Sequence, residues 1–141
     1  IPFEINALSA HRTPKMVEEF ASSAQRNGIK VIIAGAGGAA HLPGVVAAFT
    51  TLPVIGVPCR SSISIDGWDS ILSILQMPPG IPVATVGLDG ALNAGILATQ
   101  ILATDNIDIQ AKINTYKNTL QNKIIKANND LTSHEYPFRI Q

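Results

Sequence analysis

Residues 29–44, IKVIIAGAGGAAHLPG, join an apolar run to a loop of glycine and alanine. The run Ile29–Ala34 is short and rich in β-branched residues, which is typical of a parallel strand covered on both faces. The segment after the glycines, from about His41 to Phe49, is predicted to be a helix. A strand that leads through a glycine loop into a helix indicates an α/β protein with a parallel sheet.

The same alternation of strand and helix patterns extends in both directions along the chain. Thr13 is expected to cap the first helix with Pro14 at its first position, and Asp66 is expected to cap a later helix. The predicted strands are residues 1–8, 29–34, 53–57 and 81–86. The predicted helices are residues 14–27, 41–49, 67–77, 91–102 and 108–128. This order predicts one parallel sheet flanked by helices.

The composition is that of one compact domain of 141 residues. Ten basic and ten acidic residues give no net charge, so no basic field is present to attract nucleic acid. Cys59 is the one cysteine, which excludes an intrachain disulfide and favours a cytoplasmic protein. Charged residues make up 14% of the chain, and we therefore expect other subunits to cover part of its surface.

Residues 31–59 contain no Asp, Glu, Lys or Arg, a length that raises the question of a membrane-spanning helix. Glycines and prolines interrupt this segment at intervals too short for any single spanning helix. We therefore expect no contact with a membrane.

Two histidines follow neighbouring strands of the predicted sheet. His11 lies within SAHRTP, residues 9–14, and His41 ends the glycine-rich loop. One helix and one strand separate them, so both are expected at the carboxyl edge of the sheet, where open α/β sheets bind ligands. Because imidazole exchanges protons near neutral pH, this placement predicts proton-transfer catalysis by His11 and His41. Arg12 at a helix N-terminus is suited to bind a phosphate.

The sequence Gly35-x-Gly37-x-x-Ala40 also matches the dinucleotide-binding fingerprint, which leaves a nucleotide-binding oxidoreductase as an alternative. That fingerprint needs an acidic residue about 20 positions further on to hold the ribose. The end of the next strand reads GVPCR, residues 56–60, and contains no acid. Arg60 at this position would instead suit a phosphorylated ribose.

The remaining polar residues have simpler explanations. Cys59 has no activating base nearby in the sequence and is expected to be packed. Asp69 complements a helix dipole, and His134 is expected to be solvated. Three histidines and one cysteine without paired spacing predict no metal site.

Four segments resemble, in this order along the chain, the class I carboxyaminoimidazole ribonucleotide mutases of purine biosynthesis. They are SAHRTP (residues 9–14), GAGGAAHLPG (35–44), DSILSILQMPPGIPVATV (69–86) and ALNAGILATQIL (91–102). The resemblance covers about Phe3 to Leu102. The SAHRTP turn resembles the ATP-independent mutase branch, whereas the direct aminoimidazole ribonucleotide carboxylases differ in this turn and stay as an alternative.

The resemblance implies a flavodoxin-like three-layer sandwich that assembles as a homo-octamer and uses no cofactor or metal. It implies an enzyme that moves a carboxylate from the exocyclic nitrogen of a ribonucleotide to a ring carbon, with carbon dioxide as a trapped intermediate. His11 would be the general acid and base, and the helix at 108–128 would pack on neighbouring subunits. The residues implied to bind substrate near His11 and His41 are Ser9, Ala10, Arg12, Ala36, Gly37, Gly38 and Leu42.

One part of the family pattern has no counterpart in this sequence. The family's first strand, its Gly-Ser-x-Ser-Asp phosphate loop and the helix after them would precede Ile1. We therefore expect residues 1–141 to form one mutase domain that is N-terminally incomplete, with a sheet one strand short. A non-catalytic assembly or binding module follows as a third alternative.

Overall fold

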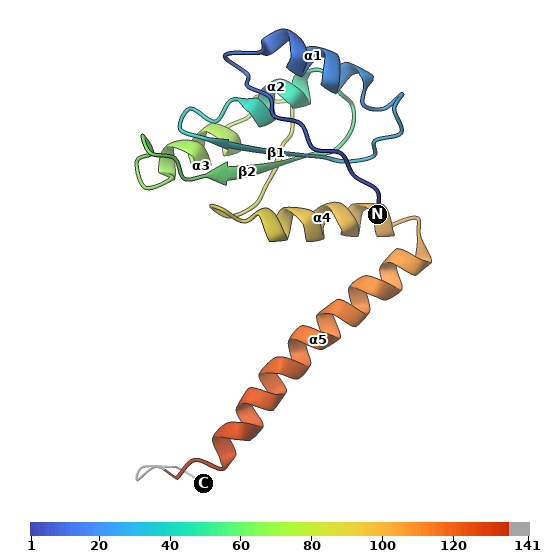
Figure 1. The fold of residues 1–141 in the computed structure, drawn as a ribbon, viewed down its shortest axis with the longest axis vertical. Helices are drawn as coiled ribbons and strands as arrows, with labels where there is room; N and C mark the ends of the chain where they lie inside the picture. The colour runs from blue at the N-terminus through green and yellow to red at the C-terminus, as the bar shows by residue number, and fades with distance from the viewer. Residues whose placement is uncertain (136–141) are drawn as a thin grey trace. The chain divides into compact units, whose positions relative to one another are not determined.

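The computed structural model describes residues 1–135. The chain divides into two compact units, Ile1–Leu102 and a second unit that begins at Ala103. The first unit contains a parallel sheet of three strands in the order β1-β2-β3, of which Figure 1 labels β1 and β2. The strands are β1 (Ile32–Gly37), β2 (Val54–Cys59) and β3 (Ala84–Thr85). The predicted α/β class with a parallel sheet is confirmed.

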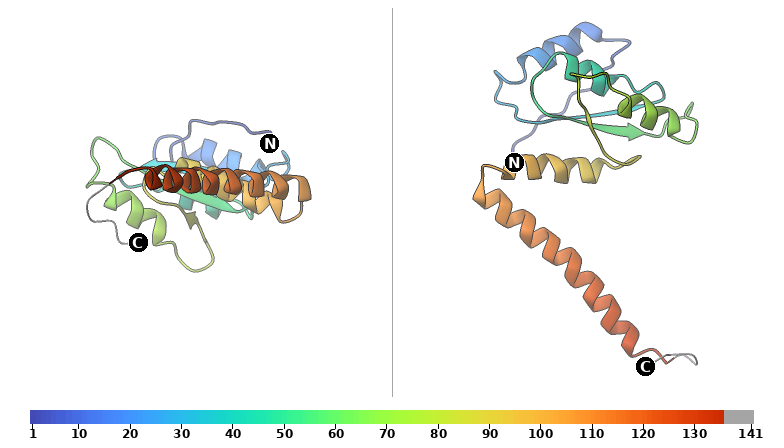
Figure 2. Two further views of the ribbon diagram at one scale, coloured as in Figure 1. Left: turned by 90° about the horizontal axis from the view of Figure 1, so that it is seen from below. Right: turned by 180° about the vertical axis from the view of Figure 1, so that it is seen from behind.

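Helices cover both faces of this sheet and make a three-layer arrangement (Figures 1 and 2). On one face lie α1 (Pro14–Ser23), α2 (Leu42–Ala48) and α3 (Trp68–Leu75). On the other face lies α4 (Ala91–Ala103), which contributes the buried Ala94. β2 is buried on both faces from Val54 to Pro58, as a strand inside a three-layer protein should be. β1 alternates between buried and exposed residues, with Ile33 46% exposed, so the prediction that residues 29–34 are covered on both faces is wrong for the isolated chain.

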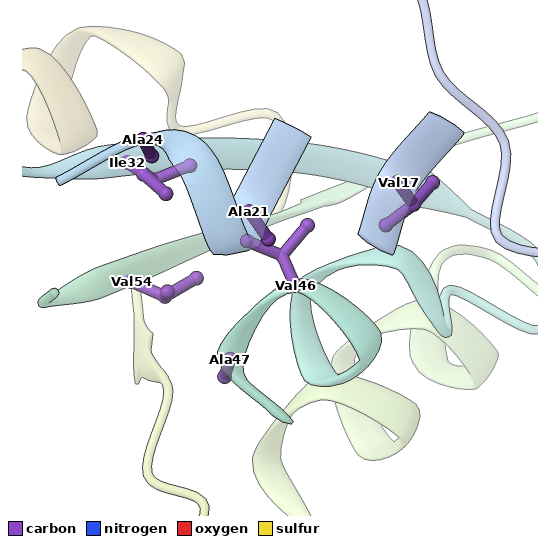
Figure 3. Close-up of a cluster of buried hydrophobic side chains, with 7 residues drawn as sticks. All are labelled: Val17, Ala21, Ala24, Ile32, Val46, Ala47 and Val54. Atoms are coloured by element: carbon purple, nitrogen blue, oxygen red, sulfur yellow. The ribbon is translucent and has the colours of Figure 1, made fainter. Parts of the chain in front are cut away.

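Small aliphatic side chains fill the core between α1, α2 and the sheet (Figure 3). Val17 and Ala21 of α1 meet Val46 of α2 above Ile32 of β1 and Val54 of β2. On the same face Ile74 of α3 packs on Gly56, where an added Cβ would lie 2.4 Å from Ile74 Cγ2. The glycine thus lets α3 approach the middle of β2 closely.

Residues 1–8 form no strand, so this prediction is wrong. Ile1, Phe3 and Ile5 are exposed, with 66%, 84% and 85% of their surfaces accessible. A strand forms only where a neighbour completes its hydrogen bonds, and among residues 1–135 β1 pairs with β2 alone. The observed sheet therefore has three strands where the sequence predicts four.

All three strands differ from their predicted bounds, and β2 begins one residue later and ends two residues later than the predicted 53–57. β1 begins three residues later than predicted and continues into the glycine segment, where Gly35 pairs with Val57 and Gly37 with Cys59. β3 is shorter than the predicted strand at 81–86. At its start, Pro82 has no N–H to donate to a neighbouring strand. At its end, Thr85 is the last residue paired with β2, and one more hydrogen bond joins Val86 N–H to the Gly56 carbonyl.

The helices lie close to their predicted positions, but two predicted caps differ. Thr13 occupies the N-cap position of α1 and Pro14 the first turn, yet the Thr13 hydroxyl makes no cap bond and turns back to Ser9. Asp66 does not cap α3. Gly67 holds that position at φ 88°, and Asp66 itself has φ 51°.

In the second unit, α5 (Ile107–Thr132) is one uninterrupted helix of 26 residues. It is longer than the predicted helix at 108–128, and the Asn106 side chain caps it by accepting a hydrogen bond from Ile109 N–H. None of its residues is buried. Its apolar stripe, including Tyr116, Leu120 and Ile124, is therefore exposed in the isolated chain.

Candidate active site

The candidate site lies at the carboxyl edge of the sheet. In Figure 1, α1 and α2 both start on the side toward which the β2 arrowhead points. β1 ends at Gly37, the chain turns through Gly38 at φ 61°, and His41 stands at the N-cap position of α2. The His41 side chain makes no cap bond, so its ring nitrogens are available for other contacts.

His11 projects from a turn that four hydrogen bonds hold in shape. Thr13 Oγ1 accepts from Ser9 N–H at 2.9 Å and donates to the Ser9 carbonyl at 3.1 Å, and Thr13 N–H donates to the same carbonyl at 2.9 Å. Arg12 N–H donates to Ser9 Oγ at 3.2 Å. Ser9 and Thr13 therefore close the turn and leave His11 and Arg12 exposed at its outer side.

The two histidines meet directly. His11 Nε2 lies 2.8 Å from His41 Nδ1, and the two rings meet edge to face with centroids 4.9 Å apart. One nitrogen of this contact carries the hydrogen and the other accepts it, so at least one ring is neutral while the bond exists. Both rings are exposed, and this open pair can pass a proton to and from a bound ligand.

The glycine segment is shaped by close approach of the strands. A Cβ at Gly37 would lie 2.8 Å from the Cys59 carbonyl oxygen, which excludes a side chain there without a backbone shift. A Cβ at Gly35 would meet Cys59 Sγ at an ordinary 3.4 Å. Because Gly35 and Gly37 belong to β1, the prediction that the glycine loop begins at Gly35 is wrong, and the first half of the segment that matches the dinucleotide-binding fingerprint is strand.

The structure groups the predicted site residues into two sets, joined by the histidine contact. Ser9, Ala10 and Arg12 share the turn that carries His11. The second set is the end of β1, the turn after it and the start of α2. That set contains Ala36, Gly37, Gly38, His41 and Leu42.

Sequence reasoning missed two residues at the same edge, Asp89 and Ser61. Asp89, at φ 55°, accepts a hydrogen bond from Arg60 N–H at 2.9 Å and donates its own N–H to the Pro58 carbonyl at 2.8 Å. It thereby ties the loop before α4 to the end of β2. Ser61 lies over Gly37 and Gly38, and its hydroxyl oxygen is buried without a partner. No local pattern marks these positions, because each depends on contacts between distant segments.

Cys59 is held as a neutral thiol. Partial burial raises its pKa, and the nearby negative charge of Asp89 raises the pKa further. A raised pKa agrees with the prediction that Cys59 is a packed residue, because a nucleophilic cysteine would need a lowered pKa.

Within residues 1–135, no three His, Cys, Asp or Glu side chains lie together as metal ligands. Over the same residues, no helix combines the length and apolar character needed to cross a membrane.

Comparison with known proteins identifies a family. Residues 1–123 match the AIR carboxylase family. The N5-carboxyaminoimidazole ribonucleotide mutase of Pyrococcus abyssi is 55% identical over 121 residues, which cover 86% of this chain and 69% of that protein. The protein of the same name from Vibrio parahaemolyticus is 55% identical over 130 residues, with 91% of this chain and 80% of that protein covered.

A solved structure shows that the fold is shared as well. The crystal structure of Treponema denticola PurE superposes with a TM-score of 0.75 at 30% sequence identity, and covers 87% of this chain and 76% of that one. The match of family, sequence and fold leads to one assignment: the chain belongs to the AIR carboxylase family.

Proposed function

We propose that this protein is an N5-carboxyaminoimidazole ribonucleotide mutase of purine biosynthesis. The observation that carries the proposal is the 2.8 Å contact between His11 Nε2 and His41 Nδ1 at the carboxyl edge of the sheet. Relatives 55% identical to this chain are named as this mutase, which favours it over the direct carboxylase. The family assignment leaves no specific support for the oxidoreductase or for a non-catalytic module.

The reaction moves a carboxylate from the exocyclic nitrogen of the aminoimidazole to a ring carbon. The carbamate C–N bond breaks, the nitrogen takes a proton, and carbon dioxide stays beside the nucleophilic ring carbon. A new C–C bond then forms at that carbon, which loses its proton. One group that first gives and then takes a proton serves both steps, and this is the role we assign to His11.

His41 assists as the partner of His11. In the observed contact one ring donates to the other, so His41 orients the His11 imidazole and shares its proton. The turn that holds His11 fixes its backbone through Ser9 and Thr13. Two positioned rings keep the proton close to the reacting atoms while carbon dioxide is trapped.

The remaining site residues would bind the substrate. Exposed Arg12 lies next to the first turn of α1, where a guanidinium and a helix N-terminus together favour a phosphate, and Ser9 and Ala10 share its turn. The carboxylate and the imidazole ring would lie against Ala36, Gly37, Gly38 and Leu42. These side chains are small or apolar, so little competes with the ring carbon for carbon dioxide.

We also propose that the protein acts as a cytoplasmic homo-oligomer, an octamer, in which residues 1–141 serve as one mutase domain. The exposed apolar stripe of α5 supports self-association, because no residue of that helix is buried in the single chain. In the assembly α5 would cover neighbouring subunits.

A direct assay tests the function. The full-length protein is mixed with the carbamate isomer without ATP or metal, and the ultraviolet absorbance of the carbon-carboxylated isomer is followed. His11→Asn should lower turnover by about 100- to 10,000-fold, the usual contribution of general acid–base catalysis. His134→Asn is the matched control, since His134 is exposed in the second unit and should not affect the rate.

A parallel reaction separates the mutase from the carboxylase. Aminoimidazole ribonucleotide with bicarbonate should give slow conversion compared with the carbamate isomer. Faster conversion from bicarbonate would identify a direct carboxylase. A folded oligomer that converts neither substrate would refute the proposal.

A further inference from the structure

Ser61 follows β2 by two residues and carries an unusual hydroxyl group. Its Oγ is buried and has no hydrogen-bond partner, and it is the one side-chain nitrogen or oxygen in this condition within residues 1–135. Buried serine hydroxyls elsewhere in the fold are bonded: Ser70 Oγ, fully buried, donates to the Gly67 carbonyl at 2.9 Å. The Ser61 hydroxyl thus stands apart from the rule that buried polar groups are paired.

An unpaired buried hydroxyl destabilises the ligand-free protein, because it has lost water and gained no other partner. An alanine at this position would keep the Cβ and avoid this loss. A serine is therefore best explained here by a partner that is absent from the isolated chain.

The surroundings of Ser61 indicate where that partner would lie. The Cβ of Ser61 is 3.1 Å from where a Cβ of Gly37 would stand, and its Oγ is 3.8 Å from where a Cβ of Gly38 would stand. Gly37 ends β1 and pairs with Cys59 of β2, so Ser61 and the glycines share the carboxyl edge of the sheet. The same turn continues to His41, the partner of His11.

We propose that Ser61 is a further substrate-binding residue, whose hydroxyl donates a hydrogen bond to an oxygen of the substrate carboxylate. This inference rests on the proposed mutase function. The phosphate is assigned to the turn of Arg12, so the group that reaches Gly37 and Gly38 is the carboxylate end. The glycines allow Ser61 to lie directly against the end of β1, beside the turn that leads to His41.

The Ser61 hydroxyl is buried in the ligand-free chain, so a neighbouring side chain must move before the substrate can reach it. Ile63 lies over the same turn, with its Cδ1 3.6 Å from where a Cβ of Gly38 would stand. Its side chain is 83% exposed, and its movement therefore loses little packing. The backbone here is held by bonds from Ser64 N–H to the Ser61 carbonyl at 3.1 Å, from Arg60 N–H to Asp89 at 2.9 Å and from Ser64 Oγ to Asp69 at 2.7 Å, so the Ile63 side chain is the part that would move.

The test compares Ser61→Ala with Ser62→Ala, its exposed neighbour, in the full-length protein. Ser61→Ala should lower kcat/KM for the carbamate isomer about 10-fold, equivalent to about 1.4 kcal/mol. The thermal midpoint of the ligand-free Ser61→Ala protein should rise by about 2–5 °C, because the unpaired hydroxyl is gone. Ser62→Ala should change neither quantity. Inhibition by ribose 5-phosphate, which has the phosphate and no carboxylate, should be equal in all three proteins.

The outcomes separate this inference from the function on which it rests. Wild-type protein without turnover would refute both. Wild-type turnover with an equally active Ser61→Ala variant would refute the Ser61 assignment alone. A lowered thermal midpoint of Ser61→Ala would show a structural bond to the hydroxyl, and weaker inhibition by ribose 5-phosphate would place Ser61 at the phosphate. Either result would overturn the assignment to the carboxylate.

Discussion

Replacing Gly37 by alanine should destabilise the protein, whereas the same change at Gly35 should not. Both glycines belong to β1, two positions apart, and both are exposed and paired with β2. The added Cβ of Gly37→Ala would lie 2.8 Å from the Cys59 carbonyl oxygen, a backbone atom that cannot rotate away. The added Cβ of Gly35→Ala would lie 3.4 Å from Cys59 Sγ, an ordinary contact.

The size of the effect follows from two opposing contributions. Forcing an extra carbon into a packed site costs about 1–3 kcal/mol. Replacing a glycine by alanine lowers the conformational entropy of the unfolded chain, which stabilises the folded protein by about 0.4–1 kcal/mol. We therefore expect Gly37→Ala to lower the free energy of unfolding by about 1–2 kcal/mol and Gly35→Ala to leave it unchanged or raise it slightly.

Urea denaturation at one fixed protein concentration measures this difference, since association would otherwise shift the midpoint. The slope of the unfolding curve should stay the same in the two variants. Turnover should also fall in Gly37→Ala, because Ser61 lies 3.1 Å from the new Cβ position and must move with the strand end. A Gly37→Ala protein as stable as Gly35→Ala would refute the close approach of β1 and β2 at this edge.

Two further predictions concern ionisable groups. Because burial and Asp89 raise the pKa of the Cys59 thiol, alkylation of native protein by iodoacetamide should be slower at pH 7.5 than that of urea-unfolded protein; equal rates would contradict the raised pKa. Ser64 Oγ donates a hydrogen bond to the Asp69 carboxylate at 2.7 Å and lowers the pKa of that carboxyl group. The ionised carboxylate therefore stabilises the folded protein at pH values above the ordinary pKa of aspartate. This stabilisation is lost as the pH falls through the lowered pKa. The gap in urea midpoint between wild type and Asp69→Asn should therefore narrow from pH 6 to pH 3, and a constant gap would contradict the lowered pKa.

Much of the fold could be predicted from local patterns. The apolar run before Gly35 predicts a buried strand, and the stripe from Ile109 to Ile125 predicts the long helix, because periodicity reports which face of an element is covered. The predicted strand at residues 1–8 failed because strand formation needs a neighbour, and no local pattern supplies one. Asp66 as a cap failed because Gly67 takes the N-cap position at positive φ.

The sequence by itself placed His41 at the carboxyl edge of the sheet, because it follows a strand and begins a helix. His11 was expected at the same edge because a strand was predicted before it, but residues 1–8 form no strand, so its position came from the tertiary structure. Only the tertiary structure decided that Nε2 of one ring lies 2.8 Å from Nδ1 of the other, and that Ser61 covers Gly37 and Gly38. These contacts join segments 20 to 30 residues apart. They depend on the register of β1 against β2 and on how closely the two strands approach, which side-chain packing across the whole unit sets.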